Sequence, residues 1–165
     1  MDHANPVETK VTYRLHRAEY LVGLAVVTGL LIANIGQVRW LPAVVLFVYI
    51  DLIGYIPGAI AYRRSPDHHV AKGYYIAYNT MHSLITQAVV AGIWMWVAGP
   101  EWALLVLPFH LFIDRGVFGN FLKPFSLAFE PEPNPAYVRL SAELLHTRPA
   151  AESTGTVPAG AAAGR

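Results

Sequence analysis

Four residues of types that bind metals or transfer protons lie inside otherwise apolar stretches of this chain. His110 and Asp114 are four residues apart in a run that is apolar from Ala103 onward, and residues at that spacing share one face of a helix. Asp51 and His82 lie in two earlier apolar stretches. Two imidazoles and two carboxylates form a nitrogen and oxygen ligand set suited to zinc, manganese or ferrous iron. We therefore predict that Asp51, His82, His110 and Asp114 bind one divalent metal ion.

Two other interpretations of these four residues stay open. Asp–His pairs between helices could form a structural network that holds a bundle together through interhelical hydrogen bonds. The same groups could also carry protons or ions across a membrane. All three interpretations require the four side chains to meet. Whether they meet depends on how the elements that carry them are arranged.

The composition places these elements in a membrane. Of the 165 residues, 55% are hydrophobic and 14% are charged, whereas about 25% of residues are charged in ordinary soluble domains. The length fits a single domain. A net charge of +1 without a basic cluster argues against a nucleic-acid partner. The chain has no cysteine, which excludes disulfides and thiolate metal ligands.

The apolar stretches predict an all-α, four-span transmembrane helical bundle over residues 18–123, since about 20 apolar residues cross a bilayer as a helix. Residues 1–17 would form a cytoplasmic segment. Residues 124–165 would form a cytoplasmic, Pro-rich and largely disordered tail with one short helix from Tyr137 to Leu145, because the prolines exclude a helix interior. The spans are expected at about residues 20–35, 41–62, 73–98 and 102–118.

The basic residues predict the orientation of the spans. They gather before the first span, after the second and at the end of the fourth, and cytoplasmic loops are enriched in Lys and Arg. Both termini and the middle loop are therefore expected on the cytoplasmic side of the inner (plasma) membrane. No small-residue cleavage site follows Ile35, so the first helix is expected to be retained. Four tryptophans fall at the opposite interface: Trp40, Trp94, Trp96 and Trp102.

This topology brings the candidate ligands to one depth. At 1.5 Å per residue, Asp51, His82 and Asp114 each lie on the order of 13–17 Å from the cytoplasmic ends of their helices. His110 lies one turn deeper. The third span carries a polar stripe that should face inward, because hydrocarbon offers no hydrogen bonds; its members are Tyr75, Asn79, His82 and Thr86. Because the four residues lie at nearly one depth, a metal or catalytic site is favoured over the chance occurrence of four unrelated polar residues.

The loop after the second span supplies two further candidates. Asp67 and His68 lie next to the expected cytoplasmic mouth of the bundle and are candidate catalytic proton carriers. A solvated loop in which Ser65 or Asp67 caps the third span is the alternative. Arg115 is expected to meet a phosphate headgroup or to extend to the interface.

Three motifs resemble those of a known family. They are Tyr49-Ile-Asp-Leu-Ile-Gly-Tyr55, Tyr78-Asn-Thr-Met-His82 and His110-Leu-Phe-Ile-Asp-Arg115. They resemble a family of small four-helix bacterial integral membrane proteins of unassigned function, with an acidic residue on helix 2, a Tyr-Asn-x-x-His motif and a His-x-x-x-Asp-Arg motif. The similarity covers about residues 20–125. More loosely, the acidic helix, His82-Ser83 and His-x-x-x-Asp are similar to inner-membrane metal-dependent hydrolases, whose upstream His-Arg is absent here unless His68-His69 substitutes for it.

This looser resemblance implies a metal-dependent membrane hydrolase that acts on a lipid-like ester or phosphoester in the lipid bilayer. One alternative is a non-enzymatic membrane subunit whose polar network is structural and whose tail docks a partner. A second is a small proton-coupled carrier, which four spans without an internal repeat would support best as a homo-oligomer.

Overall fold

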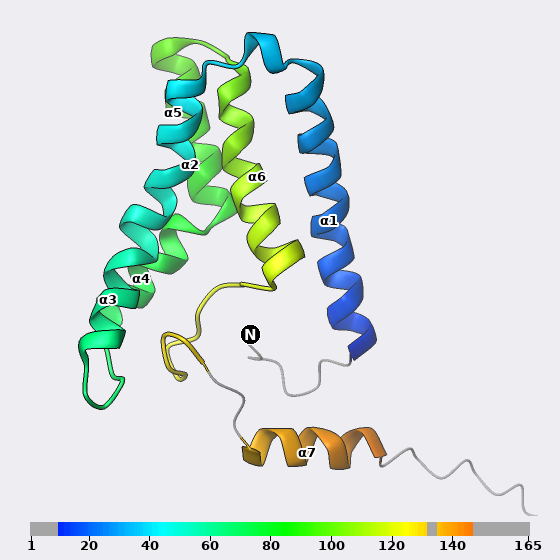
Figure 1. The fold of residues 1–165 in the computed structure, drawn as a ribbon, viewed down its shortest axis with the longest axis vertical. Helices are drawn as coiled ribbons and strands as arrows, with labels where there is room; N and C mark the ends of the chain where they lie inside the picture. The colour runs from blue at the N-terminus through cyan, green and yellow to red at the C-terminus, as the bar shows by residue number, and fades with distance from the viewer. Residues whose placement is uncertain (1–9, 132–134, 147–165) are drawn as a thin grey trace, which may run out of the picture. The chain divides into compact units, whose positions relative to one another are not determined.

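The computed structural model of the chain describes residues 10–131 and 135–146, and within these ranges the chain forms helices and irregular segments but no strand. It divides into two units, residues 1–132 and 133–165, each of which is described by itself. The described part of the first unit holds four helical rods, coloured from blue to yellow in Figure 1. This arrangement confirms the all-α bundle that the sequence predicts, and its four rods correspond to the four expected spans.

The four rods differ in how continuous they are. The first is α1 alone, and the second is α2 followed directly by α3. The third is the bent pair α4 and α5, and the fourth joins the short helices η2, α6 and η3. Their bounds are α1 Lys10–Ala33, η1 Ile35–Gln37, α2 Trp40–Gly54, α3 Ile56–Arg64, α4 Lys72–Met81, α5 Leu84–Ala98, η2 Trp102–Leu105, α6 Val106–Phe112 and η3 Ile113–Phe118.

Length and composition mark this unit as a membrane protein. Among the described residues, Val11–Ala33 and Trp40–Arg64 are each long and apolar enough to cross a membrane as one helix. The pair α4 and α5 passes the same test when its two halves are taken together. The fourth rod is built from shorter pieces, which lie against the other three.

The first helix begins earlier than the sequence predicts. α1 starts at Lys10 rather than near residue 20, because its first turns have partners on η3. The Arg17 guanidinium donates to the carbonyl of Gly116 at 2.8 and 3.0 Å and to that of Val117 at 2.6 Å. These carbonyls belong to the last turn of a helix, where a cation is favourable. α1 is thereby fixed to the fourth rod.

The third span is not the continuous helix predicted over residues 73–98. α4 ends at Met81 and α5 begins at Leu84, and the two halves are bent by 58°. Neither glycine nor proline lies at this break, so its cause must be sought in side chains that enter the backbone ladder. The predicted polar stripe therefore does not run along a single straight face.

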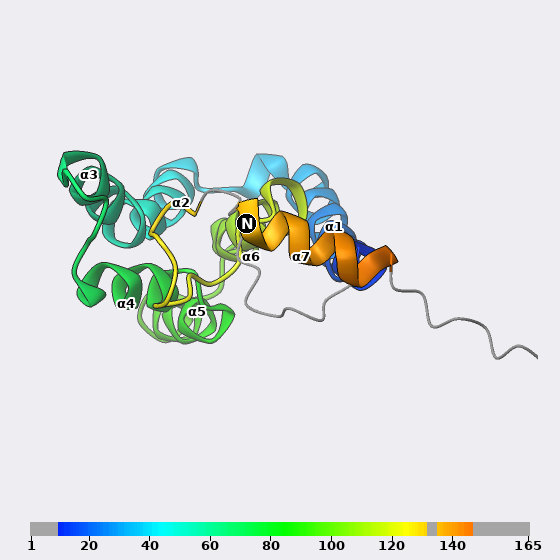
Figure 2. The same cartoon turned by 90° about the horizontal axis from the view of Figure 1, so that it is seen from below.

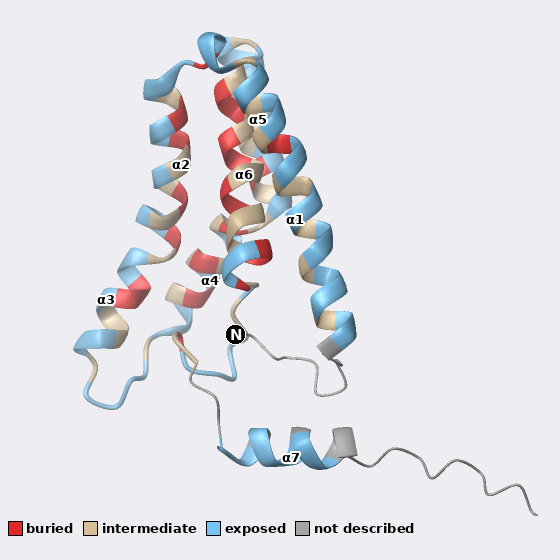
Figure 3. Ribbon diagram, turned by 45° about the vertical axis from the view of Figure 1, so that its right-hand side comes forward, coloured by how far each residue is buried: buried red, intermediate tan, exposed pale blue. Residues whose placement is uncertain are grey.

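The core lies where the fourth rod meets the others. Figure 3 shows buried residues along α6 and on the neighbouring parts of α2 and α4, whereas α1 is largely exposed. Seen from below, α6 lies between α1 and α2 (Figure 2). The inner faces of these helices therefore meet around α6, and the exposed apolar side chains of α1 and α2 suit a lipid environment.

An irregular segment, residues 119–131, follows η3 and runs back toward α3 and α4 (Figure 1). We call it the strap. Its residue Phe129 is fully buried and packs with Ala59, Tyr75 and Tyr78. Gly58 makes room for this ring, because a Cβ at that position would lie 2.3 Å from Phe129 Cζ. The buried ring of Phe129 thus anchors the strap to the bundle.

The second unit contains α7, Pro135–His146. This helix includes the short helix predicted from Tyr137 to Leu145. The predicted disorder of the tail after it concerns residues 147–165, which lie outside the described residues.

Candidate metal centre

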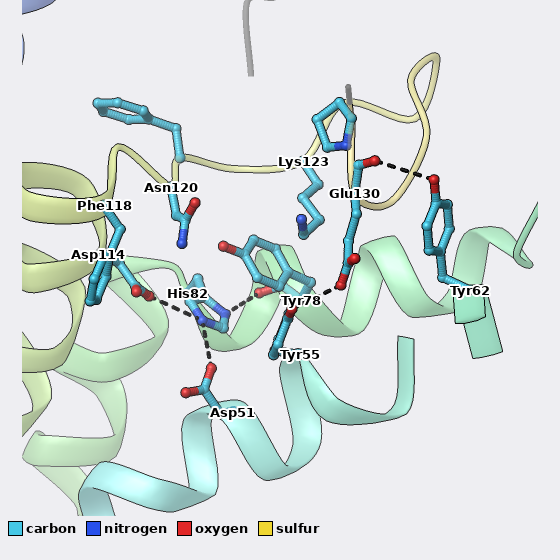
Figure 4. Close-up of a pocket in the computed structure, with 12 residues that line it drawn as sticks. Asp51, Tyr55, Tyr62, Tyr78, His82, Asp114, Phe118, Asn120, Lys123 and Glu130 are labelled. Atoms are coloured by element: carbon cyan, nitrogen blue, oxygen red, sulfur yellow. Dashed lines mark hydrogen bonds and ion pairs between the residues drawn. The ribbon is translucent and has the colours of Figure 1, made fainter. Parts of the chain in front are cut away.

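The four predicted ligands meet in the bundle. His82 Nε2 lies 3.3 Å from Asp51 Oδ1 and 3.3 Å from Asp114 Oδ2. His110 Nε2 lies 3.6 Å from Asp51 Oδ2 and 3.5 Å from Asp114 Oδ2. Each imidazole therefore faces both carboxylates. Figure 4 shows His82 between Asp51 and Asp114, which approach from different helices. The helical depth argument correctly predicted this meeting of side chains.

The site is closed on the imidazole side and open on the carboxylate side. Both histidine side chains are only 4% exposed, whereas Asp114 is 15% and Asp51 is 40% exposed. Asp51, His82 and His110 offer ligand atoms that all lie within 4.8 Å of one another. A small cation could be held by these atoms and still be reached from the side of Asp51. This group of Asp and His residues could hold a metal ion.

The hydrogen bond of His82 indicates where its proton lies. Its Nδ1 is 3.0 Å from the carbonyl oxygen of Tyr78, which can only accept. Nδ1 must therefore carry a hydrogen, and in the neutral ring Nε2 then has a lone pair. That lone pair faces two carboxylates and, within the described part of the chain, makes no hydrogen bond. This arrangement requires either a further proton, on the ring or on one of the carboxyl groups, or a cation between the groups.

Ring packing fixes both imidazoles. The ring of Tyr78 stacks on that of His82 with centroids 3.9 Å apart and planes 13° apart. The ring of Phe47 lies 4.6 Å from that of His110. His110 Nδ1 is buried and has no hydrogen-bond partner among the described residues. The orientation of His110 therefore rests on packing and on the two carboxylates.

The helix break that carries His82 is supported by two side chains. Gln87 Nε2 donates to the carbonyl of Met81 at 2.5 Å, and the Gln87 carbonyl accepts the hydroxyl of Tyr49. Arg115 donates to the carbonyl of His82 at 2.8 Å. These bonds satisfy carbonyls that the break removes from the regular helical ladder, as a bilayer requires. Arg115 is buried, so neither a headgroup contact nor extension to the interface describes it.

Asp114 lies in a wider helical turn. η3 is a π-helix that ends at Phe118 and is capped by Gly119, whose φ is +73°, a conformation that glycine adopts without strain. The carbonyl of Asp114 accepts the amide of Asn120 at 2.8 Å. Such single π-helical turns often occur at functional sites. Here the turn leads the chain from the candidate ligand directly into the strap.

A cavity of about 590 Å³ opens onto the site. Asp51, His82 and Asp114 line its inner part, and the strap contributes several of its walls (Figure 4). The rest of the lining is mainly aromatic, with single amide, ammonium and carboxylate groups. These lining residues are Tyr55, Tyr62, Tyr78, Phe118, Phe121, Asn120, Lys123, Glu130 and Pro131. A ligand in this cavity would touch three of the four candidate metal ligands, whereas His110 lies outside the lining.

Polar contacts hold the strap against the cavity. The Asn79 side chain donates to the carbonyl of Lys123 at 2.8 Å and accepts its amide at 2.7 Å. Asn79, a member of the predicted polar stripe, therefore binds the strap. The Tyr55 hydroxyl donates to the Glu130 carboxylate at 2.8 Å, and Lys123 Nζ donates to the carbonyl of Phe129 at 2.5 Å.

The structure does not bring Asp67 and His68 into the cavity lining. Asp67 accepts the Ser65 hydroxyl at 2.5 Å and the His69 amide at 3.3 Å. The hydrogen bond from Ser65 is the main reason that the pKa of Asp67 is lowered from its ordinary value. His68 stacks on Tyr62 with centroids 4.9 Å apart. These bonds are those of a locally capped, exposed loop, and the proton-carrier role of the two residues stays a prediction.

Comparison with protein-family models, with curated proteins and with solved structures finds no match to this chain. The assignment of a function therefore depends on the chemistry of the site itself.

Sequence reasoning missed the residues that support the candidate ligands. Gln87 was visible as a polar residue in an apolar helix, and Arg115 as a cation next to Asp114, but their partners are backbone carbonyls that carry no sequence signal. Glu130 and Phe129 lie in a Pro-rich segment whose lack of periodicity hides which residues point inward.

Proposed function

We propose that this protein is a metal-dependent hydrolase of the inner membrane that acts on a lipid-like ester or phosphoester. Asp51, His82, His110 and Asp114 would hold one divalent ion, with zinc, manganese and iron as the candidates. The predicted orientation, with both termini in the cytoplasm, and the family resemblance belong to the same proposal.

One observation carries this proposal: the lone pair of His82 Nε2 faces two carboxylates at 3.3 Å. A bare lone pair between two anions is unfavourable, and a divalent cation removes the repulsion from all three groups at once. The Tyr78 carbonyl accepts a hydrogen bond from Nδ1 and so leaves Nε2 free to bind a metal, which is the arrangement that metal-binding histidines usually show. The nitrogen and oxygen donors also match the preference of these metals.

The surrounding residues suit an amphiphilic substrate. When bound, a divalent ion polarises an ester or phosphoester oxygen and makes a bound water more acidic. Asp51 is the most exposed of the four ligands and faces the cavity, so the reacting group would approach from its side. The tyrosine and phenylalanine side chains of the cavity would contact the apolar part of the substrate. The buried histidines would keep the ligand geometry fixed.

Elemental analysis tests the metal site directly. The purified protein, offered zinc, manganese and iron at neutral pH, should retain close to one ion per chain. His110→Ala should lose it, because one of the two imidazole ligands is gone. His68→Ala is the matched control, since that histidine lies on the exposed loop, and it should bind as much metal as the wild type. Absence of metal from the wild type would refute the proposal.

Activity is tested separately. Lipid esters and phosphoesters are offered to the metal-loaded protein, and His82→Gln and Asp114→Asn should lose hydrolysis while inserting normally. Retained activity in either variant would exclude the proposed reaction at this site.

A second candidate function rests on the pairing of the four residues with one another. If both imidazoles carry two protons, two positive and two negative charges cancel, and the ion pairs at 3.3–3.6 Å are complete without a metal. The protein would then be a non-enzymatic subunit whose polar network specifies helix packing. In that case no metal binds, and replacing His82 or Asp114 destabilises the fold.

A further inference from the structure

The break at His82 exposes one carbonyl that a continuous helix would satisfy. In a regular helix the carbonyl of His82 accepts the amide of Thr86, four residues later. Here it accepts the Arg115 guanidinium at 2.8 Å instead. A buried carbonyl in a bilayer must have a partner, so this hydrogen bond and the bend at His82 depend on each other.

Arg115 also ties the break to α1. A second guanidinium nitrogen donates to the Tyr20 hydroxyl of α1 at 3.0 Å, and the guanidinium carbon lies 5.1 Å from the centre of that ring. Arg115 is 8% exposed. A single buried cation therefore links α1, η3 and the break in the third span.

We propose that Arg115 is a positioning residue for the candidate metal centre: it holds the third span bent so that His82 Nε2 faces Asp51 and Asp114. The inference rests on the proposed metal site. Arg115 acts through the His82 backbone. It follows Asp114 directly in the chain, so the residue that holds His82 is covalently joined to one of the carboxylate residues that His82 faces.

Removal of the guanidinium has a definite structural consequence. The His82 carbonyl would lose its partner and could regain one only from the helical amide of Thr86. Forming that bond straightens the third span and rotates the imidazole away from the two carboxylates. Gln87 would still hold the carbonyl of Met81, which is only one of the two carbonyls at the break. The ligand set would then lose one of its imidazoles without any change in the ligands themselves.

The test compares two arginines that both donate to backbone carbonyls. Arg115→Met keeps a long side chain but removes the donors. Arg17→Met is the matched control, because Arg17 donates to the carbonyls of Gly116 and Val117 between the same two elements but does not touch His82. Arg115→Lys restores a cation and a donor. Zinc affinity is measured by competition with a chelator, alongside the unfolding midpoint of each variant.

We expect Arg115→Met to bind zinc about 10- to 100-fold more weakly, as is usual when the group that orients a ligand is lost. Arg17→Met should bind as the wild type does, and Arg115→Lys should recover part of the affinity. Should Arg115→Met fail to fold, Arg115→Lys decides, since its shorter and single donor should still weaken zinc binding measurably.

A metal-free measurement separates this inference from the proposed function. The ¹⁵N signals of the His82 imidazole are recorded in zinc-free protein, where Arg115→Met should shift them and Arg17→Met should not. If the wild-type protein binds no zinc, the proposed function is overturned. The His82 signals of the metal-free protein would still decide whether Arg115 positions His82. Unchanged zinc affinity together with unchanged His82 signals in Arg115→Met would overturn the inference.

Discussion

Replacing Gly58 by alanine should release the strap from the bundle. The new Cβ would lie 2.3, 2.6 and 2.8 Å from three carbons of the Phe129 ring, far inside van der Waals contact. The ring is completely buried and its neighbours Tyr75 and Tyr78 are buried as well, so it has no room to slide. Either the ring leaves its site or α3 moves away from the strap.

Both outcomes cost a similar amount of free energy. Expelling the phenylalanine ring forfeits about 1.5–3 kcal/mol of burial. Keeping it in an overpacked site costs about 1–3 kcal/mol. Alanine also gains about 0.5–1 kcal/mol over glycine within a helix, and Gly92→Ala measures that gain alone, because nothing lies within 4 Å of a Cβ at Gly92. Relative to Gly92→Ala, we expect Gly58→Ala to be less stable by about 1–3 kcal/mol.

The assay is reversible unfolding in mixed detergent micelles, followed by far-ultraviolet circular dichroism. Phe129→Ala alone should cost about 3–5 kcal/mol. In the double variant the new methyl group of Gly58→Ala meets no ring, so adding it to Phe129→Ala should cost nothing further. The two substitutions are therefore expected to be strongly non-additive.

Two results would refute this reasoning. One is a Gly58→Ala protein as stable as Gly92→Ala, which would mean that no ring occupies the space above Gly58. The other is simple additivity in the double variant, which would place the cost of the alanine somewhere other than Phe129.

Three further outcomes are expected. Asn79→Ala should speed amide exchange at Lys123, whose backbone it holds with two hydrogen bonds; exchange as slow as in the wild type would contradict this role. Zinc affinity of the wild type should fall as the pH is lowered from about 7.5 to about 5.5, because imidazole and carboxylate ligands must be deprotonated to bind, and chelator competition measures it. Ser65→Ala should raise the pKa of Asp67 toward its ordinary value, because the hydroxyl that stabilises the ionised carboxylate is removed; an unchanged carboxyl titration by ¹³C NMR would disprove it.

Helical geometry made the candidate site predictable. The spacing of His110 and Asp114, and the distance of Asp51 and His82 from the ends of their spans, depend only on the period and rise of a helix. These quantities hold wherever an apolar run is long enough to span a membrane. The four side chains could therefore be placed together before any contact between helices was known.

The break in the third span could not be predicted in the same way. Its sequence contains neither proline nor glycine at Met81–Leu84, so no helix-breaking residue marks the position of the bend. The bend is stable because the side chains of Gln87 and Arg115 donate to the carbonyls of Met81 and His82. Neither hydrogen bond follows the regular spacing of a helix, so neither can be expected from the sequence. The strap was missed for a related reason, since an irregular segment has no periodicity from which a buried Phe129 could be recognised.

The hydrogen bond between Arg115 and the His82 carbonyl has a consequence for the order in which the protein assembles in the membrane. Arg115 follows His82 by 33 residues, so it is synthesised only after the whole third span has been made. Until then no guanidinium is available to the His82 carbonyl, and the proposed role of Arg115 predicts that the third span enters the bilayer straight. Helices of membrane proteins associate after they insert, so the bend at His82 arises at association, when the last span arrives. The candidate metal centre is consequently a late product of assembly, and a chain truncated before Arg115 would insert its first three spans without forming it.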